Sequence, residues 1–409
     1  MNNALIFKIT RDNLTYRAFI NDNVHTKFGD VLMRRVVRWP LISLILVVLL
    51  TAASSLNAET LRVATFNISL EANRLQPKNT PLVLGSVLEA IKQGHPLVRN
   101  VSDIIRYNNP DVILLNEIDA DRDTLAAFVA QLGVDFPYTF IPEVNTGVLS
   151  QVDVNHDGQL SLPSDGYGFG HYPGHYGMAL LSKYPIQHAD VRCLNTFLWK
   201  DMPGALLPIA SDGSAWYSMQ DLTSLRLSSK THCDVPVLVN NVVISVIISH
   251  PTPPVFDGPE DRNGKRNHDE VRLIKDYLEQ ADYLASYVAG RDFSLRRFVI
   301  LGDLNASVDS DATVPGTMQQ LLNHPLINAN SLPISEGAAQ HTPQNPNAAA
   351  HTAAWRSRAD YVLPSHFGFR VRHSEVFWPA KNAPLAHLMS RDGSDHRLVL
   401  MDLDITAKH

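Results

Sequence analysis

Asp303 and Asn305 have side chains that can orient water and bind a phosphate oxygen. They follow the apolar run of residues 298–301 and Gly302, and they stand two residues apart. Because residues i and i+2 of an extended segment point to the same face, both side chains can reach one pocket. Asp303 could orient an attacking water there, while Asn305 donates a hydrogen bond to the phosphate. The alternative is a strand followed by a turn that these side chains only cap.

Asp360, His250 and His396 also adjoin apolar runs and are suited to proton transfer. Asp360 opens the segment Asp-Tyr-Val-Leu-Pro, and His250 ends the apolar run of residues 242–249. His396 follows Asp395 just before another apolar run. A carboxylate that orients a histidine is a recurring arrangement for a base and its partner. The chain has 17 histidines, so the prediction depends on the neighbouring motifs and not on any histidine alone.

Glu117 ends the segment Asp-Val-Ile-Leu-Leu-Asn-Glu, which is apolar enough for a central strand. Its carboxylate would then lie at the end of the strand with few solvating neighbours. Mg²⁺ prefers carboxylate and water oxygens and binds substrate phosphate through its open positions. Glu117 is therefore a candidate metal ligand, and the alternative is an exposed carboxylate of the kind common on any protein surface.

Together with Asn67 in Ala-Thr-Phe-Asn, these blocks occur in an order that resembles the endonuclease/exonuclease/phosphatase superfamily. That superfamily includes deoxyribonuclease I, exonuclease III, the neutral sphingomyelinases and the inositol polyphosphate 5-phosphatases. The resemblance covers roughly residues 61–405. It implies an α/β fold of the deoxyribonuclease I type, a four-layered α/β sandwich in which two packed β-sheets are flanked by helices.

The resemblance also implies a metal site. Mg²⁺ or Mn²⁺ would be held chiefly by Glu117, with Asn67 beside it and Asp395 close by. The ion would serve a phosphate-ester substrate, for which nucleic acid is one candidate.

The same resemblance assigns catalytic roles. Asp360 would orient His396 and stabilise its charged form, and His250 would protonate the leaving oxygen. The full catalytic set consists of His250, Asp303, Asn305, Asp360 and His396.

Four further residues are candidates for substrate binding. His175 stands where the abasic-site endonucleases of the superfamily have tyrosine, which argues against a DNA-repair enzyme. Arg262 and Arg266 lie in a Pro/Gly-rich segment after His250 that resembles poorly characterised secreted bacterial members. Guanidinium groups bind phosphate oxygens bidentately, so both arginines could hold a substrate phosphate, with Asn267 beside them. The alternative is a solvated loop before a helix that begins near Asn267.

Residues 153–164 follow the spacing of a calcium-binding loop. Asp153, Asn155 and Asp157 occupy positions 1, 3 and 5, and a glycine occupies position 6. Position 12 is Ser164 instead of a bidentate glutamate, and Asp165 lies one residue late. A structural Ca²⁺ site and a plain turn rich in Asp and Asn are therefore both candidates.

Apolar runs at strand spacing alternate with runs at helical spacing along the chain. The strand-like runs are residues 61–68, 112–115, 178–181, 237–249, 298–301, 360–363 and 398–405. The helix-like runs are residues 85–107, 125–132, 269–288 and 315–322. The alternation favours an α/β sandwich with helices outside two packed sheets. Residues 140–177 and 323–356 are predicted to be loops that overhang the active site, because each leads into a site motif.

The N-terminal region has the pattern of a secretory signal. Three arginines precede the apolar run of residues 40–53, small residues follow it, and the run is short for a membrane-spanning helix. We predict that residues 1–32 are a mis-assigned or dispensable extension before a start at Met33, and that residues 33–58 are a signal peptide. Residues 59–409 would form a single periplasmic or secreted domain without an integral membrane segment. The alternative is an uncleaved N-terminal anchor.

Charge and cysteine content limit the function further. Residues 1–58 contain seven Lys/Arg and three Asp, so the exported part would hold 28 positive and 38 negative residues. A net charge near −10 gives no general attraction to nucleic acid, although a local basic groove could exist. Export favours a disulfide between Cys193 and Cys233, and the alternative is two buried thiols.

Three functions fit these observations. The preferred one is an exported phosphatase or phosphodiesterase that acts on an organic phosphate. An extracellular nuclease is the alternative within the same class, and a sphingomyelinase would need exposed apolar loops that the sequence does not identify. An inactive binding module with the same fold is the alternative of another class, and the joint presence of all the catalytic residue types argues against it.

Overall fold

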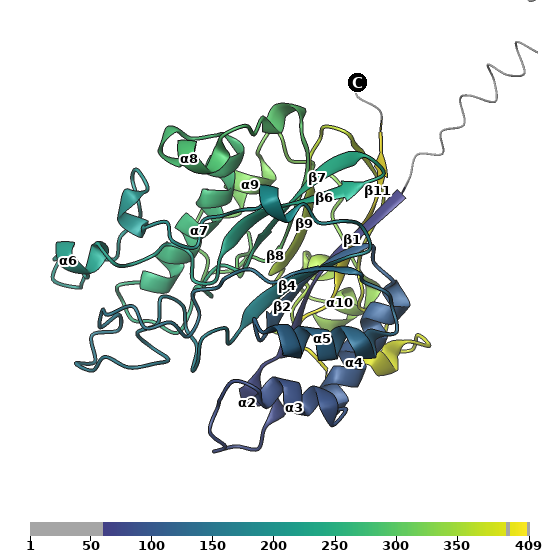
Figure 1. Ribbon diagram of the computed structural model, residues 1–409, viewed down its shortest axis with the longest axis horizontal. Coiled ribbons are helices and arrows are strands. Elements are labelled where there is room, and N and C mark those ends of the chain that lie inside the picture. Colours follow the sequence, from purple (N-terminus) through teal and green to yellow (C-terminus); the bar gives the residue numbers. More distant parts are fainter. Residues whose placement is uncertain (1–59, 390–392, 407–409) are drawn as a thin grey trace, which may run out of the picture. The chain divides into compact units, whose positions relative to one another are not determined.

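The computed structural model describes residues 60–389 and 393–406 (Figure 1). These residues belong to one compact unit, Ala58–His409. The predicted extension 1–32 and signal peptide 33–58 lie outside the described residues and stay predictions. Among the described residues, no helix combines the length and the apolar character that crossing a membrane requires.

The strands form two mixed sheets. The six-stranded sheet has the order β10-β11-β1-β2-β4-β3, and the five-stranded sheet has the order β5-β6-β7-β8-β9. The pairs β1/β2 and β7/β8 run parallel, and the other neighbours run antiparallel. The first sheet comprises β1 (Thr60–Leu70), β2 (Val112–Ile118), β3 (Tyr138–Phe140), β4 (Gly177–Ser182), β10 (Phe369–Val376) and β11 (Val399–Ile405). The second comprises β5 (Arg192–Cys193), β6 (His232–Val239), β7 (Val242–Ser249), β8 (Arg297–Asp303) and β9 (Asp360–Pro364).

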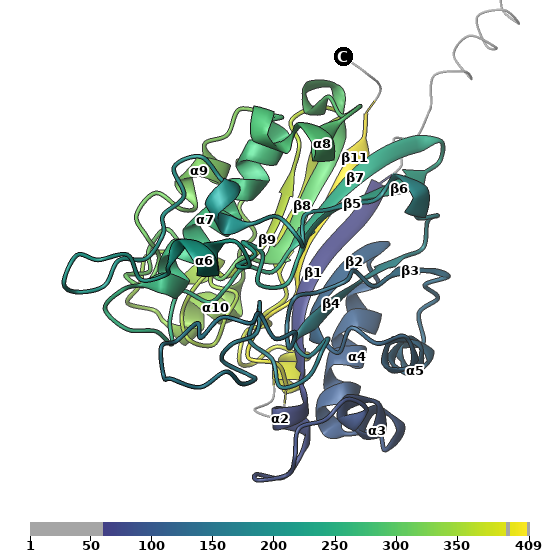
Figure 2. The same ribbon diagram turned by 60° about the vertical axis from the view of Figure 1, so that its left-hand side comes forward.

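Helices cover the outer faces of both sheets (Figure 2). Helices α3 (Ser86–Lys92), α4 (Pro96–Asn108) and α5 (Arg122–Leu132) pack on the six-stranded sheet, and α7 (Arg262–Leu278) packs on the five-stranded sheet. The short helices are α2 (Ala72–Leu75), α6 (Met219–Leu222), α8 (Ala285–Val288), α9 (Gln319–Leu322) and α10 (Glu336–His341). Single 3₁₀ turns occur at His188–Asp190, Trp199–Asp201, Asp282–Leu284, Phe293–Leu295, Ala348–Ala350 and Ala386–Met389.

The hydrophobic core is divided into three layers by the two sheets. In β8, Val299 and Leu301 lie in the layer between the sheets, whereas Phe298 and Ile300 pack in the layer that contains α7. This follows from the two-residue period of a strand, which turns successive side chains to opposite faces. A third layer lies between the six-stranded sheet and α3 to α5. The predicted four-layered α/β sandwich is thus confirmed.

Several predicted boundaries are wrong for local reasons. The run 237–249 is two strands, because Asn240 and Asn241 both adopt positive φ and form a hairpin turn. The helical run 85–107 is two helices, since Pro96 begins α4 anew after Gly94. Helix α7 begins at Arg262, seven residues before the predicted start, and ends at Leu278.

The predicted disulfide is confirmed. Cys193 of β5 and Cys233 of β6 face each other across the paired strands and are joined by an S–S bond. Residues 194–231 therefore leave the sheet after β5 and return to it at β6, and the disulfide joins the two strands where they do so.

Candidate active site

Asp303 lies at the centre of a group of polar side chains from both sheets. Its Oδ2 atom accepts a 3.0 Å hydrogen bond from Nδ2 of Asn67. The same oxygen lies 3.4 Å from Nε2 of His250 and 3.6 Å from Nε2 of His396. Its Oδ1 atom accepts a 3.0 Å hydrogen bond from the backbone N–H of Asn305. The sequence prediction that these residues share one site agrees with this arrangement.

Strand periodicity explains why these side chains meet. Apolar residues of β1, β7, β8 and β9 alternate between the core layers, and the site residues continue the row that faces the opposite sheet. Thus Asp303 follows Val299 and Leu301, and Asp360 precedes Val362. The parallel strands β7 and β8 end at the same edge, and the antiparallel β9 begins there. The site therefore forms where the core between the sheets ends.

His396 is held by Asp360 in a buried hydrogen bond. Nδ1 of His396 lies 2.9 Å from Oδ2 of Asp360, which also accepts a 2.7 Å hydrogen bond from the hydroxyl of Thr352. Burial alone would lower the pKa of His396, but the charges of Asp360 and Asp303 outweigh it and raise the pKa to about 10. His396 therefore carries a proton at neutral pH, beside the carboxylate of Asp303.

His250 has the opposite protonation behaviour. It is fully buried, and burial together with the positive charges of Lys230 and His396 holds its pKa well below the usual value of a histidine. Its Nδ1 atom has no hydrogen-bond partner within the described part of the chain. The site thus contains one charged and one neutral imidazole, each within 3.6 Å of Asp303.

Glu117, His250 and Asp303 could hold a metal ion together. One ligand atom from each residue lies within 4.8 Å of the other two. Two carboxylates and a neutral imidazole suit a divalent cation such as Mg²⁺ or Mn²⁺. The donor set therefore fits the cofactor that the sequence predicts, with Glu117 as one of the ligands.

The two other predicted metal ligands are engaged elsewhere. Asn67 uses its amide to bind Asp303, and its Oδ1 atom accepts the backbone N–H of Ser69. The Oδ1 atom of Asp395 lies 2.8 Å from the guanidinium of Arg74 and 2.9 Å from the hydroxyl of Ser69. These contacts orient neighbouring groups, and direct binding of the ion by Asn67 and Asp395 stays a prediction.

Several residues at this edge have positive φ although they are not glycines. The φ angles are 58° at Glu117, 50° at Asn305, 49° at Ser69 and 54° at Tyr176. Such conformations cost free energy and persist where the surrounding structure enforces them, often at functional sites. Their concentration around the proposed metal ligands is consistent with a site built to hold side chains in fixed directions.

Lys230 is a site residue that the sequence did not reveal. It is buried two residues before β6, and no partner for its ammonium group is found among the described residues in the form of a hydrogen bond or an ion pair. Burial lowers the pKa of Lys230, while the nearby charges of Glu270, Glu117 and Asp303 oppose that shift. A buried unpaired cation beside these carboxylates suits a substrate phosphate. The only signal in the sequence is one lysine among small polar residues, which no motif marks.

The sequence also did not indicate that Glu71 and Tyr176 lie near the site. Burial and the charge of Glu117 raise the pKa of Glu71 to about 8, so this side chain lies near the proposed metal site. The Tyr176 hydroxyl donates a 3.0 Å hydrogen bond to Asn73, and its ring stacks near that of His175. The predicted substrate contact of His175 is not supported, because the His175 side chain is fully buried between Tyr172 and Tyr176.

The predicted phosphate clamp is also not supported. The guanidinium of Arg266 is buried and donates hydrogen bonds to the backbone carbonyls of Tyr167, Arg226 and Leu227. Arg262 pairs with Glu260.

Asn267 is buried and holds two loops, and substrate binding by it is not supported. Its Nδ2 atom donates to the carbonyls of Thr252 and Leu304. The sequence identified the polar character of this segment, but residue type alone does not distinguish a solvated arginine or asparagine from one that organises the protein interior.

The predicted calcium loop forms a network of turns. The carboxylate of Asp153 accepts the backbone N–H groups of Asp157 and Gly158, and Asn155 donates to Asp157. The buried Asp165 accepts the backbone N–H groups of Val154 and Ser161. These bonds match the alternative of a turn rich in Asp and Asn, and Ca²⁺ binding stays a prediction.

Exposed apolar side chains occur on the segments that lead into or out of the site motifs. Phe256 is 87% exposed and follows His250, and Val308 is exposed after Asn305. Trp355 is 50% exposed and precedes Asp360. Its ring meets the His396 ring edge to face, with centroids 4.6 Å apart. Trp355 is therefore an exposed apolar side chain in contact with the site, which the sequence analysis did not identify.

A family model described as the Endonuclease/Exonuclease/phosphatase family matches residues 64–396. The chain belongs to this family. Members of the endonuclease/exonuclease/phosphatase family are phosphoesterases, so the match agrees with the chemistry of the site. No curated protein matches the chain.

Solved structures with a similar fold share little sequence with the chain. An endonuclease/exonuclease/phosphatase from Beutenbergia cavernae is 18% identical with a TM-score of 0.47, and the match covers 85% of this chain and 72% of that one. The human Nocturnin catalytic domain with bound sulfate is 14% identical with a TM-score of 0.45, with coverages of 86% and 95%. Sphingomyelinase C from Streptomyces griseocarneus is 16% identical with a TM-score of 0.41, with coverages of 84% and 99%.

Proposed function

We propose that this chain is an exported phosphoesterase that requires a divalent metal ion and hydrolyses the phosphate ester of an organic substrate by in-line attack of water. The position of Asp303 carries the proposal, since its Oδ2 atom lies within 3.6 Å of both histidines and one of its carboxylate oxygens belongs to the donor set with Glu117 and His250. When bound by Glu117, His250 and Asp303, Mg²⁺ or Mn²⁺ would neutralise negative charge on the phosphoryl group.

Asp303 and His396 are suited to the two proton transfers. As the water oxygen bonds to phosphorus and the ester bond breaks, the carboxylate oxygen of Asp303 that does not bind the metal ion accepts the water proton. His396 holds a proton at neutral pH and donates it to the leaving oxygen. This assignment replaces the expectation that His250 is the proton donor, because the low pKa of His250 leaves its imidazole neutral.

Amide and ammonium groups would hold the phosphoryl group during this step. One N–H of Asn305 donates to the carbonyl of Pro251, which leaves the second available for a phosphate oxygen. Lys230 contributes a positive charge from the buried side of the site. Such preorganised donors stabilise the charge of a phosphoryl transition state.

The apolar loops support an organic substrate with an apolar or aromatic group. Trp355 is half-exposed and its ring contacts that of His396, and Phe256 and Val308 are exposed on the segments that follow His250 and Asn305 in the chain. A phosphodiester or monoester with such a group could bury apolar surface while its phosphate lies at Asp303.

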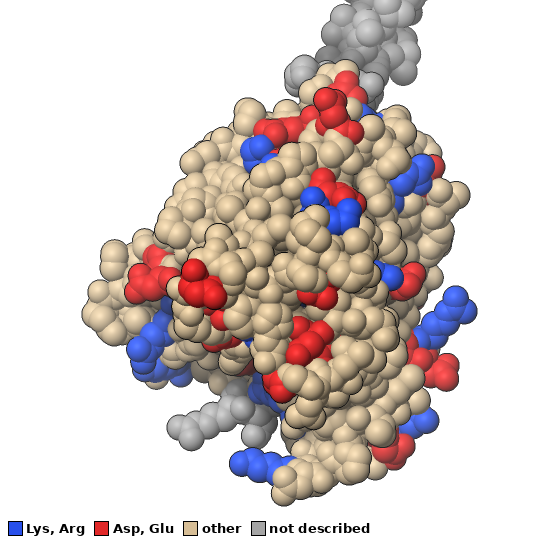
Figure 3. Space-filling model, turned by 90° about the vertical axis from the view of Figure 1, so that its left-hand side faces the viewer, with Lys and Arg blue, Asp and Glu red and all other residues tan. Residues whose placement is uncertain are grey.

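A nuclease is the alternative within this class. Figure 3 shows one face on which basic and acidic side chains are scattered among uncharged residues, and the acidic net charge gives no general attraction to nucleic acid. An inactive module would explain neither the two imidazoles beside Asp303 nor a Lys230 ammonium group that has no ion-pair partner among the described residues. We therefore favour a phosphatase or phosphodiesterase.

Export to the periplasm or the medium is part of the proposal. The signal-like pattern of residues 33–58 and the disulfide between Cys193 and Cys233 support it, since disulfides persist in oxidising compartments. N-terminal sequencing of the mature protein should find cleavage near Ala58. A mature chain that retained residues 1–32 would contradict export by this route.

The proposed activity is tested with a panel of phosphomonoesters, phosphodiesters, phospholipids and DNA, each assayed with Mg²⁺, Mn²⁺ and Ca²⁺. We expect metal-dependent release of phosphate or of an alcohol from at least one organic ester. Glu117→Gln should abolish that activity without changing the circular dichroism spectrum. If the wild-type protein hydrolysed DNA alone, the nuclease alternative would replace the proposal.

A further inference from the structure

The first turns of α7 form a buried polar hub, which we define as Arg266, Asn267, Asp269 and Glu270. All four side chains bond to loops outside the helix, and Asn267, Asp269 and Glu270 are fully buried. A helix that buries charged groups normally does so only where they are hydrogen-bonded. The hub therefore connects loops that the chain brings together from distant positions.

Glu270 differs from the rest of the hub in the loops that it joins. Its Oε1 atom accepts a 2.6 Å hydrogen bond from the backbone N–H of Ser229, and its Oε2 atom accepts a 2.6 Å hydrogen bond from the backbone N–H of Thr252. Ser229 directly precedes Lys230, and Thr252 lies two residues after His250. The Glu270 carboxylate thus binds the backbone next to Lys230 and the backbone two residues after His250.

The charge of Glu270 also acts on Lys230. Its carboxylate opposes the lowering of the Lys230 pKa by burial, so it favours the charged ammonium. Hydrogen bonds to an ionised acceptor are shorter and stronger than neutral ones, which suits a group that must fix two backbones. A neutral amide in its place would keep the volume and lose the charge and one acceptor.

We propose that Glu270 is a positioning residue that fixes Lys230 and His250 relative to each other, so that the ammonium and the imidazole face the same phosphoryl group. This inference rests on the proposed function. Glu270 does not contact the substrate, and its effect on hydrolysis passes through the two loops that it joins.

Asp269 provides a matched control within the hub. It is the neighbouring residue, is equally buried, and its Oδ2 atom accepts 2.7 Å hydrogen bonds from Nε1 of Trp199 and from the backbone N–H of Leu206. Neither Trp199 nor Leu206 adjoins Lys230 or His250 in the chain. Asp269→Asn therefore removes a comparable buried carboxylate without loosening the backbones next to Lys230 and His250.

The test compares Glu270→Gln with Asp269→Asn on the best substrate of the panel. We expect comparable decreases in Tm, but a loss of kcat that is about tenfold or more larger for Glu270→Gln than for Asp269→Asn. In a Lys230→Met background, the effect of Glu270→Gln on kcat should shrink by most of its size, because residues that act through one another are not additive. Equal kcat losses in the two variants, or full additivity with Lys230→Met, would overturn the inference.

A binding measurement separates this inference from the proposed function. Inorganic phosphate titrated calorimetrically into the full chain with Mg²⁺ should bind several-fold more weakly to Glu270→Gln than to Asp269→Asn. That result would support positioning of Lys230 even if the panel contained no hydrolysed ester. Equal phosphate affinity in the two variants would contradict it, whereas a wild-type protein that bound phosphate and hydrolysed nothing would count against the proposed function alone.

Discussion

Asn67 of β1 donates a 3.0 Å hydrogen bond to Asp303 of β8, 236 residues later in the chain. The two strands belong to different sheets, so this bond exists only when the sheets are packed against each other. The carboxylate that faces both histidines is therefore oriented by tertiary structure. Catalysis and correct packing of the two sheets should consequently be lost together.

We expect His396→Ala and Asp303→Asn each to lower kcat by about 10² or more while the fold is retained, as is typical when a proton-transfer group is lost. The double variant should be only slightly worse than the poorer single variant, because the two side chains act as a unit. Steady-state kinetics with circular dichroism as the folding control would check this. Near-full activity in His396→Ala, or activity unaffected by a chelator, would contradict the mechanism.

The pKa of His396 predicts how stability depends on pH. The folded-state pKa is raised from 6.5 to about 10, so protonated His396 stabilises the fold fully below about pH 6.5. That contribution is lost as the pH rises through about 10. Asp360→Asn removes the largest raising charge, so the titration midpoint of His396 should move to lower pH. NMR of ¹⁵N-histidine-labelled protein would measure it, and an unchanged midpoint would show that Asp360 does not set the protonation.

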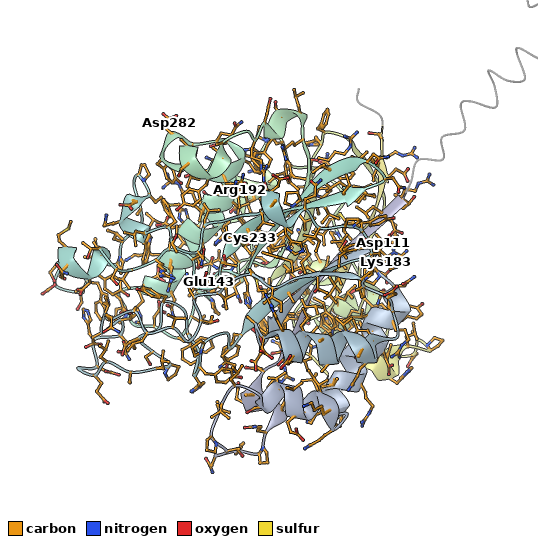
Figure 4. The ribbon with its side chains drawn as sticks, viewed as in Figure 1. Asp111, Glu143, Lys183, Arg192, Cys233 and Asp282 are labelled. Atoms are coloured by element: carbon orange, nitrogen blue, oxygen red, sulfur yellow. A yellow bond between two sulfur atoms is a disulfide. The ribbon has the colours of Figure 1, made fainter. Side chains whose placement is uncertain are left out.

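Removal of the disulfide should destabilise the domain by about 2–4 kcal/mol, since the cross-link restricts the unfolded chain. The change is Cys193→Ser with Cys233→Ser, and denaturant unfolding is the measurement. Figure 4 marks Cys233 within the sheet region. As a direct check on the wild type, alkylation of the non-reduced, denatured protein should label no thiol. Labelling of both cysteines would mean that the bond does not form.

Trp355→Ala should raise KM about tenfold for a substrate with an apolar group, because a half-exposed aromatic ring offers contact area beside the reacting phosphate. The KM for glycerol phosphate, which lacks such a group, should change little. Leu295→Ala removes an exposed side chain on the segment before β8 and is the control. If both substrates lost affinity equally, Trp355 would serve the shape of the site and not the recognition of apolar groups.

Sequence reasoning located the parts of the site that strands position. Asp303 could be predicted because it continues an alternating apolar strand, and the family resemblance pointed to Asp360 and His250, which the structure places on the same rows of their strands. Glu117 was identified for a similar reason, at the end of β2.

Residues on loops could not be placed in the same way. Lys230 lies in the site because backbone bonds to α7 hold its loop, which no local pattern encodes. Arg266 was predicted to bind phosphate from its charge alone, but backbone carbonyls use its donors. The break at Pro96 and the turn at Asn240 depended on local turn chemistry that the apolar pattern concealed.

The segment of residues 352–357 connects an exposed side chain to His396, the proposed proton donor. Thr352 binds Asp360, backbone bonds close the segment between Ala353 and Ser357, and Trp355 at its tip meets His396. A small molecule that displaced the Trp355 side chain would therefore strain the hydrogen bond between Thr352 and Asp360. The hydrogen bond between Asp360 and His396 would then be weakened. An inhibitor of this chain need not resemble a phosphate. An uncharged aromatic compound that displaces the Trp355 side chain would inhibit the proposed activity without occupying the phosphate position.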